Sequence, residues 1–171
     1  MNEEIFPLVD ESGNIIGAAP RSECHSGSML LHPVIHLHII DKDGKILLQR
    51  RSLKKDIQPG KWDTAVGGHV DLGENVHTAL MREAREELGI DASEAVFITS
   101  YVFRSTVERE LVYSFYLREK EPLKIEPDPI EIEEVRFWSP EEIKSSLDKD
   151  ILTENFKLEF RKIYPEIKNN L

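Results

Sequence analysis

The segment GHVDLGENVHTALMREAREELGI, residues 68–90, contains three acidic residues spaced for one face of a helix. Glu83, Glu86 and Glu87 stand at positions i, i+3 and i+4, which share a narrow stripe when each residue turns the helix by about 100°. Carboxylates crowded on one face repel each other, so the stripe needs a cation between them. Oxygen ligands of this kind select Mg²⁺ or Mn²⁺ over Zn²⁺. The segment therefore predicts a divalent-metal site.

The same segment could instead be a charged helix exposed to solvent, and two features argue against that alternative. Leu80, Ala84 and Leu88 recur every four residues, which gives the helix an apolar stripe for packing on a core. Glycines flank the helix, and they give a phosphate group room to approach the backbone near the helix start. We therefore include Gly68 among the predicted substrate-binding residues.

This segment resembles the Nudix hydrolase signature, G-x5-E-x7-R-E-U-x-E-E-x-G-U, in which U is a bulky apolar residue. Every fixed position matches, and the first U position holds the smaller Ala84. In that family the signature forms a loop-helix-loop whose acids hold the metals that bind a diphosphate. The resemblance implies as metal ligands Glu83, Glu86 and Glu87, and as residues that orient the helix Arg82 and Glu74.

Patterns along the rest of the chain predict strands separated by helices. Turn sequences at residues 11–14 and 41–44 join apolar segments into two hairpins. Strands are predicted at residues 5–9, 15–18, 32–40, 45–50, 62–66, 96–104, 111–117 and 131–137. Helices are predicted at residues 75–88, after a capping box at Ser139, and at residues 151–163. This order indicates an α+β fold, and the resemblance implies a Nudix-type α/β/α sandwich with a mixed β-sheet.

Composition restricts the class of protein. The chain has 171 residues, of which 40% are hydrophobic and 32% charged, and a formal net charge of −10, so we expect one domain over residues 1–171. The negative charge argues against a nucleic acid polymer as partner but permits a phosphorylated small molecule, because bound metals reverse the local charge. A single cysteine, an acidic N-terminus and no long apolar stretch predict a cytoplasmic protein without a membrane segment. The oligomeric state stays open.

Outside this segment, residues 5–164 resemble the isopentenyl diphosphate isomerase branch of the same superfamily. In those enzymes three histidines and two glutamates hold a divalent metal beside the alkene. The residues that match this second metal site are His25, His32, His69, Glu108 and Glu110. Those that match the basic diphosphate ligands are Arg21, Arg51 and Lys55, and Glu87 matches the isomerase magnesium ligand. Mixed imidazole and carboxylate ligands suit manganese, iron or zinc.

The likeness to the isomerases breaks at Gly67, where they carry a catalytic cysteine two residues before a metal-binding histidine. Glycine cannot donate or accept a proton, so the acid–base pair across an alkene is incomplete. The isomerases also lack part of the acidic triad, whereas Glu83 and Glu86 are both present here. We therefore predict a metal-dependent hydrolase that cleaves a diphosphate linkage in a nucleoside or organic diphosphate derivative.

Within this hypothesis Glu86 is the first choice for positioning or deprotonating the attacking water, and Glu83 and Arg82 complete the predicted catalytic set. Glu133 and Glu134 are alternative bases. The predicted phosphate ligands are Arg21, Arg51 and Lys55. Two other functions stay open: an isomerase that uses a different acid near Gly67, and a non-catalytic sensor of a diphosphate ligand.

Three further histidines match no family ligand. His36 and His38 share one strand face with His32, and we expect them to have a structural role or to face solvent. His77 lies on the predicted helix and is expected to be solvated.

Overall fold

The computed structural model describes residues 2–169, and their core is a mixed seven-stranded sheet. The strand order is β5-β4-β3-β8-β7, with β6 paired to β3 and β9 paired to β4. The strands are β3 (Leu31–Ile40), β4 (Ile46–Arg51), β5 (Trp62–Thr64), β6 (Val66–His69), β7 (Val96–Arg104), β8 (Arg109–Arg118) and β9 (Ile132–Trp138). Strands β3 and β8 run parallel, and the other pairs are antiparallel. The predicted α+β class is confirmed. The predicted single domain over residues 1–171 includes residues 1, 170 and 171, which lie outside the described residues.

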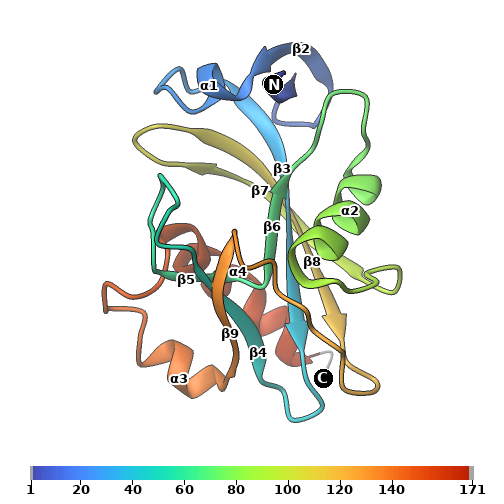
Figure 1. The fold of residues 1–171 in the computed structure, drawn as a ribbon, viewed down its shortest axis with the longest axis vertical. Coiled ribbons are helices and arrows are strands. Elements are labelled where there is room, and N and C mark those ends of the chain that lie inside the picture. Colours follow the sequence, from blue (N-terminus) through green and yellow to red (C-terminus); the bar gives the residue numbers. More distant parts are fainter. Residues whose placement is uncertain (1, 170–171) are drawn as a thin grey trace.

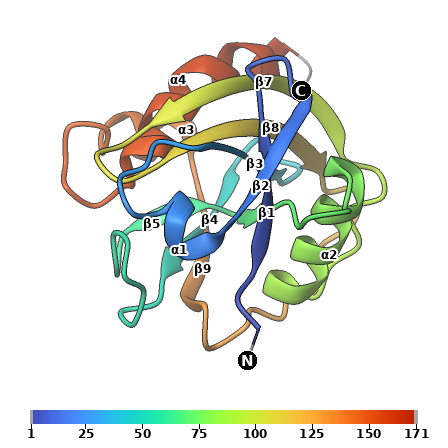
Figure 2. The ribbon, with the colours of Figure 1, turned by 90° about the horizontal axis from the view of Figure 1, so that it is seen from above.

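Two helices, α2 (Val76–Leu88) and α4 (Glu154–Asn169), cover opposite faces of the sheet (Figures 1 and 2). Successive residues of a strand point to opposite faces. Ile35, Leu37 and Ile39 of β3 belong to one core with the apolar side of α2. Ile40, on the other face, packs with Ile163 of α4. The layered arrangement predicted from the sequence is therefore present.

The sheet opens where β4 leaves β3. Strand β4 pairs with β3 only at Ile46 and Ile40, whereas β6 takes the same edge of β3 from Val34 to Leu37. Strands β5 and β9 continue from β4, so these three strands turn away from β3, β8 and β7 (Figure 1). This divergence leaves room for a cleft between the two halves of the sheet.

Helix α2 begins and ends where the sequence predicts. The Asn75 side chain accepts a hydrogen bond from the Thr78 backbone N–H at 2.8 Å, which caps the first turn. Gly89 ends the helix in the left-handed region, with φ of 68°. Ser139 and Glu142 form the predicted capping box of α3 (Pro140–Lys144). These local signals fix the helix bounds.

The structure also differs from the predictions, among other places in the extent of α4, which ends at Asn169 rather than at residue 163. The strand predicted at residues 62–66 is two strands, β5 and β6, because Ala65 leaves one pairing partner for another. Helix α4 begins at Glu154 rather than residue 151, since Leu152 forms a bridge to Trp62 instead. The short helix α1 (Arg21–Cys24) was not predicted, and it follows the separate hairpin of β1 (Ile5–Val9) and β2 (Ile15–Pro20). No helix among the described residues is long and apolar enough to cross a membrane.

A buried ion-pair cluster fastens α4 to the sheet. Glu159 of α4 accepts hydrogen bonds from His36 Nδ1 at 2.5 Å and from His38 Nε2 at 2.9 Å. The Ser114 hydroxyl of β8 donates to the same carboxylate. Glu159 is fully buried, and an unpaired carboxylate there would cost several kcal/mol. His36 and His38 are buried, so of the two roles expected for them the structural one is confirmed and the solvent-facing one is wrong. His77 is exposed, as predicted.

The cluster gives stability a defined pH dependence. Burial alone would lower the pKa of His36, but the Glu159 carboxylate, helped by Asp63 and Glu110, raises it from 6.5 to about 9. Because the folded pKa lies above the unfolded one, the contribution of His36 is complete below pH 6.5 and disappears as the pH rises through 9. The difference in unfolding free energy between the wild type and His36→Asn should fall over this interval by up to about 1.4 kcal/mol per pH unit. Urea denaturation at several pH values measures it, and a difference that grows with pH contradicts the assignment.

Candidate active site

A cleft of about 360 Å³ lies between the diverging halves of the sheet and the start of the α2 acidic stripe. Of the side chains that line it, ten are acidic and four are Lys or Arg. The cleft is lined by every residue of the predicted catalytic, phosphate-binding and metal-ligand sets except His32, which is fully buried beside it. A small anion alone would be repelled from such a surface, so the cleft suits a ligand that enters together with cations.

Arg82 organises the acidic side of the cleft. Its guanidinium donates two hydrogen bonds of 2.9 Å to the Glu74 carboxylate and one of 3.0 Å to the His69 carbonyl. The same side chain donates to Glu83 at 2.7 Å and to Glu86 at 3.2 Å. These contacts hold two of the three acids and tie the helix to β6. The hydrogen bonds from Arg82 also lower the pKa of Glu74, so Glu74 stays a carboxylate.

Gly68 is required for the position of Glu83. A Cβ atom at residue 68 would overlap Cγ and Cδ of Glu83. The chain at Gly68 is part of β6, opposite Ile35, so the strand cannot move aside without breaking its pairing. The glycine therefore lets the helix carboxylate lie directly against the strand, a role different from the predicted phosphate approach.

The three stripe acids have different surroundings. Glu87 is buried and accepts hydrogen bonds from Gln49 Nε2 at 3.0 Å and from the Gly67 backbone N–H at 3.3 Å. Burial, together with the charge of Glu83, raises the pKa of Glu87 to about 8. Burial also raises the pKa of Glu83. Glu86, by contrast, is 60% exposed at the cleft, where it can reach a water molecule.

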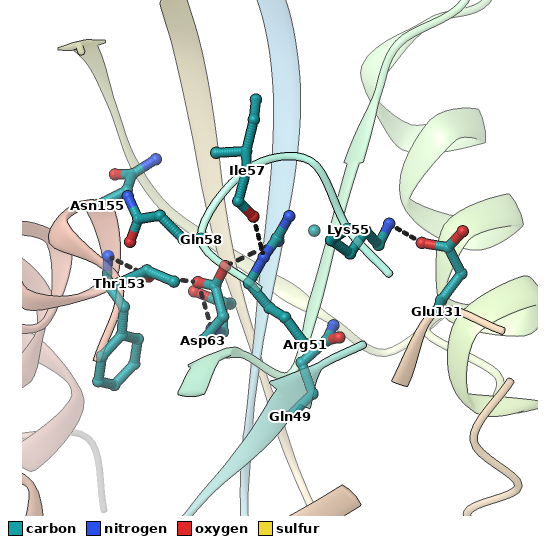
Figure 3. Close-up of polar contacts among 12 residues, drawn as sticks. Gln49, Arg51, Lys55, Ile57, Gln58, Asp63, Glu131, Thr153 and Asn155 are labelled. Carbon is teal, nitrogen blue, oxygen red and sulfur yellow. Dashed lines mark hydrogen bonds and ion pairs between the residues drawn. The ribbon is translucent and has the colours of Figure 1, made fainter. Parts of the chain in front are cut away.

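The three cations predicted to bind phosphate reach the cleft, and each is paired with an acid. Figure 3 shows the pairs of Arg51 and Lys55. Arg51 donates to Asp63 at 3.2 Å and to the Ile57 carbonyl at 3.0 Å. Lys55 pairs with Glu131, and burial lowers its pKa. Arg21 pairs with Glu4 at 2.6 Å, and both side chains are about half exposed. These pairs keep the cations at the cleft wall.

The second predicted ligand set converges although its members come from distant segments. Ligand atoms of His25, His32 and His69 lie within 4.8 Å of one another, and so do those of His32, Glu108 and Glu110. His32 belongs to both groups and therefore joins them into one five-residue cluster. His25 Nε2 lies 3.1 Å from His69 Nε2 and 3.3 Å from a Glu108 oxygen.

The donor atoms of this cluster fit a bound cation. His32 Nδ1 lies 2.9 Å from the Leu30 carbonyl, which only accepts hydrogen bonds, so Nδ1 carries the proton. His32 Nε2 is then a lone pair, and it is buried without a hydrogen bond, as is Oε2 of Glu108. Burial lowers the pKa of all three histidines, that of His25 to about 4, so the rings are neutral. Two lone-pair atoms buried together repel unless a cation lies between them.

Two residues that line the cleft, and one that packs against His69, were not predicted from the sequence. Phe6 of β1 is fully buried and stacks on His69, with ring centroids 4.3 Å apart. Asn155 and Asp63 line the cleft from α4 and β5. The alternative bases Glu133 and Glu134 do not line it. Glu133 accepts a hydrogen bond from the Leu53 N–H, and Glu134 pairs with Arg50. No sequence pattern marks Asn155 or Phe6, because each comes from a segment far from the signature.

Comparisons with known proteins agree with this geometry. The NUDIX domain profile matches residues 30–160. An isopentenyl-diphosphate Delta-isomerase of Brevibacterium linens is 34% identical over 151 residues, which cover 85% of this chain and 82% of that protein. An uncharacterized Nudix hydrolase of Yersinia pestis is 35% identical over 146 residues, covering 85% and 79%.

Solved structures show the same fold. The DR0079 protein of Deinococcus radiodurans superposes with a TM-score of 0.78 at 23% identity, over 94% of this chain and 99% of that one. A MutT protein of Methanosarcina mazei superposes with a TM-score of 0.65 at 24% identity, over 81% and 96%. The signature segment, its acidic helix and the profile match together show that the chain belongs to the NUDIX family, in a branch similar to the isopentenyl diphosphate isomerases.

Proposed function

We propose that the protein is a divalent-metal-dependent hydrolase that cleaves a diphosphate linkage in a nucleoside or organic diphosphate derivative. The observation that carries this proposal is the cleft with its excess of carboxylates, into which the α2 stripe and three cationic side chains all project. A diphosphate is attracted there only when cations accompany it. The intact acidic stripe favours catalysis over a role that only senses a ligand.

Glu83, Glu86 and Glu87 would hold Mg²⁺ or Mn²⁺. The fit is supported by the burial of Glu83 and Glu87, because burial raises the pKa of both carboxyl groups and a divalent cation beside them would stabilise their charged forms. A bound divalent ion supplies charge neutralisation on the phosphate oxygens and acidifies a coordinated water. The second cluster, around His32, would hold a further divalent ion.

The protein's own groups divide the remaining work. Glu86 is exposed at the cleft and accepts the proton of the attacking water on a carboxylate oxygen. Arg82 orients Glu83 and Glu86 through its hydrogen bonds. Arg51, Lys55 and Arg21 bind the outer phosphate oxygens by exchanging their present acidic partners for the substrate.

An isopentenyl diphosphate isomerase is the second candidate. It is favoured by the complete His/Glu cluster and by the relatives of that name at 34% identity. It is opposed by Gly67, which lacks a proton-transferring side chain at the position of the isomerase cysteine. Hydrolysis requires no group at that position, so we retain the hydrolase as the proposal.

Replacing Gly68 by alanine should weaken divalent-metal binding at α2. The added Cβ displaces Glu83, so the affinity of one class of Mn²⁺ sites should fall roughly tenfold or more. Gly67→Ala is the matched control, since its Cβ would meet no atom closer than 3.4 Å. Titration with Mn²⁺ followed by electron paramagnetic resonance measures both variants. Unchanged Mn²⁺ affinity in a folded Gly68→Ala protein would remove Glu83 from the ligand set.

A Mg²⁺-dependent screen tests the proposed reaction. The panel contains nucleoside diphosphate derivatives, dinucleoside polyphosphates and isoprenoid diphosphates, with release of phosphate, diphosphate or a nucleotide as the readout. We expect hydrolysis of at least one compound, and Glu86→Gln should lower its kcat by roughly a hundredfold or more.

Glu133→Gln and Glu134→Gln are the matched controls, because both carboxylates lie outside the cleft lining, and they should keep wild-type turnover. Conversion of isopentenyl diphosphate to its dimethylallyl isomer without hydrolysis would establish the second candidate instead. Binding without any turnover across the panel would establish a sensor.

A further inference from the structure

The cleft has an inner wall that the proposed phosphate chemistry does not use. His36 of β3 lines it opposite Gly67 of β6. A Cβ atom at residue 67 would lie 3.4 Å from Cδ2 of His36 and 3.6 Å from its Nε2. The Cδ2–Nε2 edge of the ring therefore faces the space that the glycine leaves open. Among the described residues no hydrogen bond reaches Nε2, and this atom is not among the buried, unpartnered ones.

The other edge of the ring is held rigidly. Nδ1 donates to Glu159 Oε2 at 2.5 Å, and a carboxylate can only accept, so the proton on Nδ1 is fixed. Glu159 is itself held by His38 and Ser114, so it cannot turn to another partner. The carboxylate favours the charged imidazolium, whose pKa of about 9 leaves a second proton on Nε2 at neutral pH. His36 thus presents a charge-assisted donor to the cleft.

Polar groups of other elements line the same cleft, and the carboxylates of Asp63 and Glu110 are close enough to His36 to help raise its pKa. Asn155 of α4 accepts a hydrogen bond from the Tyr101 hydroxyl at 2.6 Å and lies 3.5 Å from Glu110. Asp63 accepts from Thr153 at 2.9 Å. Figure 3 shows Asn155, Gln58 and Thr153 gathered with Asp63 on one side of Arg51, away from the Lys55–Glu131 pair.

A hydrocarbon group would fit this wall poorly. It would remove water from His36, Asp63 and Asn155 without replacing their hydrogen bonds, which is costly for each group. An additional anion would meet the nearby carboxylates of Asp63 and Glu110. A neutral group with many hydroxyl or carbonyl oxygens both donates and accepts, and therefore matches the wall.

We propose that the inner end of the cleft is a subsite for the group joined to the diphosphate, and that Nε2 of His36, positioned by Glu159, binds an oxygen of a sugar-like group there. The inference rests on the proposed function, because it identifies the polar class to which the second half of the substrate belongs. His36 is the specificity-determining contact, and Glu159 is the residue that positions it.

The test compares substrates with and without such a group. His36→Asn keeps an amide near the position of Nδ1, where it can still reach Glu159, and removes the donor at Nε2. We expect kcat/KM for ADP-ribose to fall roughly ten- to hundredfold, as for loss of a hydrogen bond from a charged donor. Hydrolysis of inorganic pyrophosphate, which has no such group, should change by less than about twofold.

His38→Asn is the matched control for disturbance of the buried carboxylate. His38 also donates to Glu159 but is 1% exposed and does not line the cleft. Its replacement should therefore not separate the two substrates. If His36→Asn lowers kcat/KM equally for ADP-ribose and pyrophosphate, the subsite is overturned and the hydrolase proposal stays intact. The same holds if kcat/KM for isopentenyl diphosphate falls as much as that for ADP-ribose.

A binding readout separates the two proposals. In wild-type protein labelled with ¹⁵N-histidine, the Nε2 resonance of His36 is identified by its loss in His36→Asn or, if that variant does not fold, in His36→Gln. ADP-ribose added in the presence of Ca²⁺ should shift this resonance, and pyrophosphate should not. If the wild type hydrolyses neither compound but the selective shift is present, the hydrolase proposal fails and the subsite stands. A shift with both ligands, or with neither, overturns the subsite whether or not hydrolysis is found.

Discussion

Repulsion between carboxylates is the constraint on which the site depends. Glu83, Glu86 and Glu87 would spread apart on a free helix, but the apolar side of α2 is packed into the core and Arg82 holds two of them from within the stripe. Glu87 is buried against β6, where burial and Glu83 raise its pKa to about 8. Holding these oxygens together therefore lowers the stability of the folded protein, and a cation that binds them would raise that stability again. If the proposed function is right, the packing that lowers the stability of α2 also sets the affinity of the site for a divalent cation.

The same reasoning applies to the second cluster, which is built differently. There the ligands come from the C-terminal end of α1, from β3, β6 and β8, and from the turn between β7 and β8, and no single helix aligns them. The parallel pairing of β3 with β8 sets His32 beside Glu110, while the antiparallel pairing of β3 with β6 sets His69 beside Val34. Sheet register thus does for this cluster what helical periodicity does for the α2 acids.

Sequence reasoning succeeded where the signal is local. The bounds of α2 follow from Asn75 and Gly89, and the first hairpin follows from its turn residues, so these elements were predicted closely. The second turn was also predicted, but the strands beside it pair only at Ile40 and Ile46 because β6 takes the edge of β3. The change of partner at Ala65 could not be predicted, because it depends on which strand lies alongside. Likewise, the prediction of the five-ligand cluster came from a family resemblance rather than from spacing. Glu159 and Asn155 carried no signal, since their roles arise only when α4 meets β3 and the cleft.

The Phe6–His69 stack has a consequence for where this catalytic unit begins. The family profile matches from residue 30, yet Phe6 and His25 lie before that point and form one wall of the His/Glu cluster. The hairpin of β1 and β2 also joins the loop that leads into α2, through the Leu72 N–H and the Ile5 carbonyl at 3.0 Å. A chain that began at residue 30, where the family profile begins, would keep the acidic helix but lose His25 and the Phe6 ring that stacks on His69. The N-terminal hairpin is thus an integral part of the candidate site rather than an appendage to it.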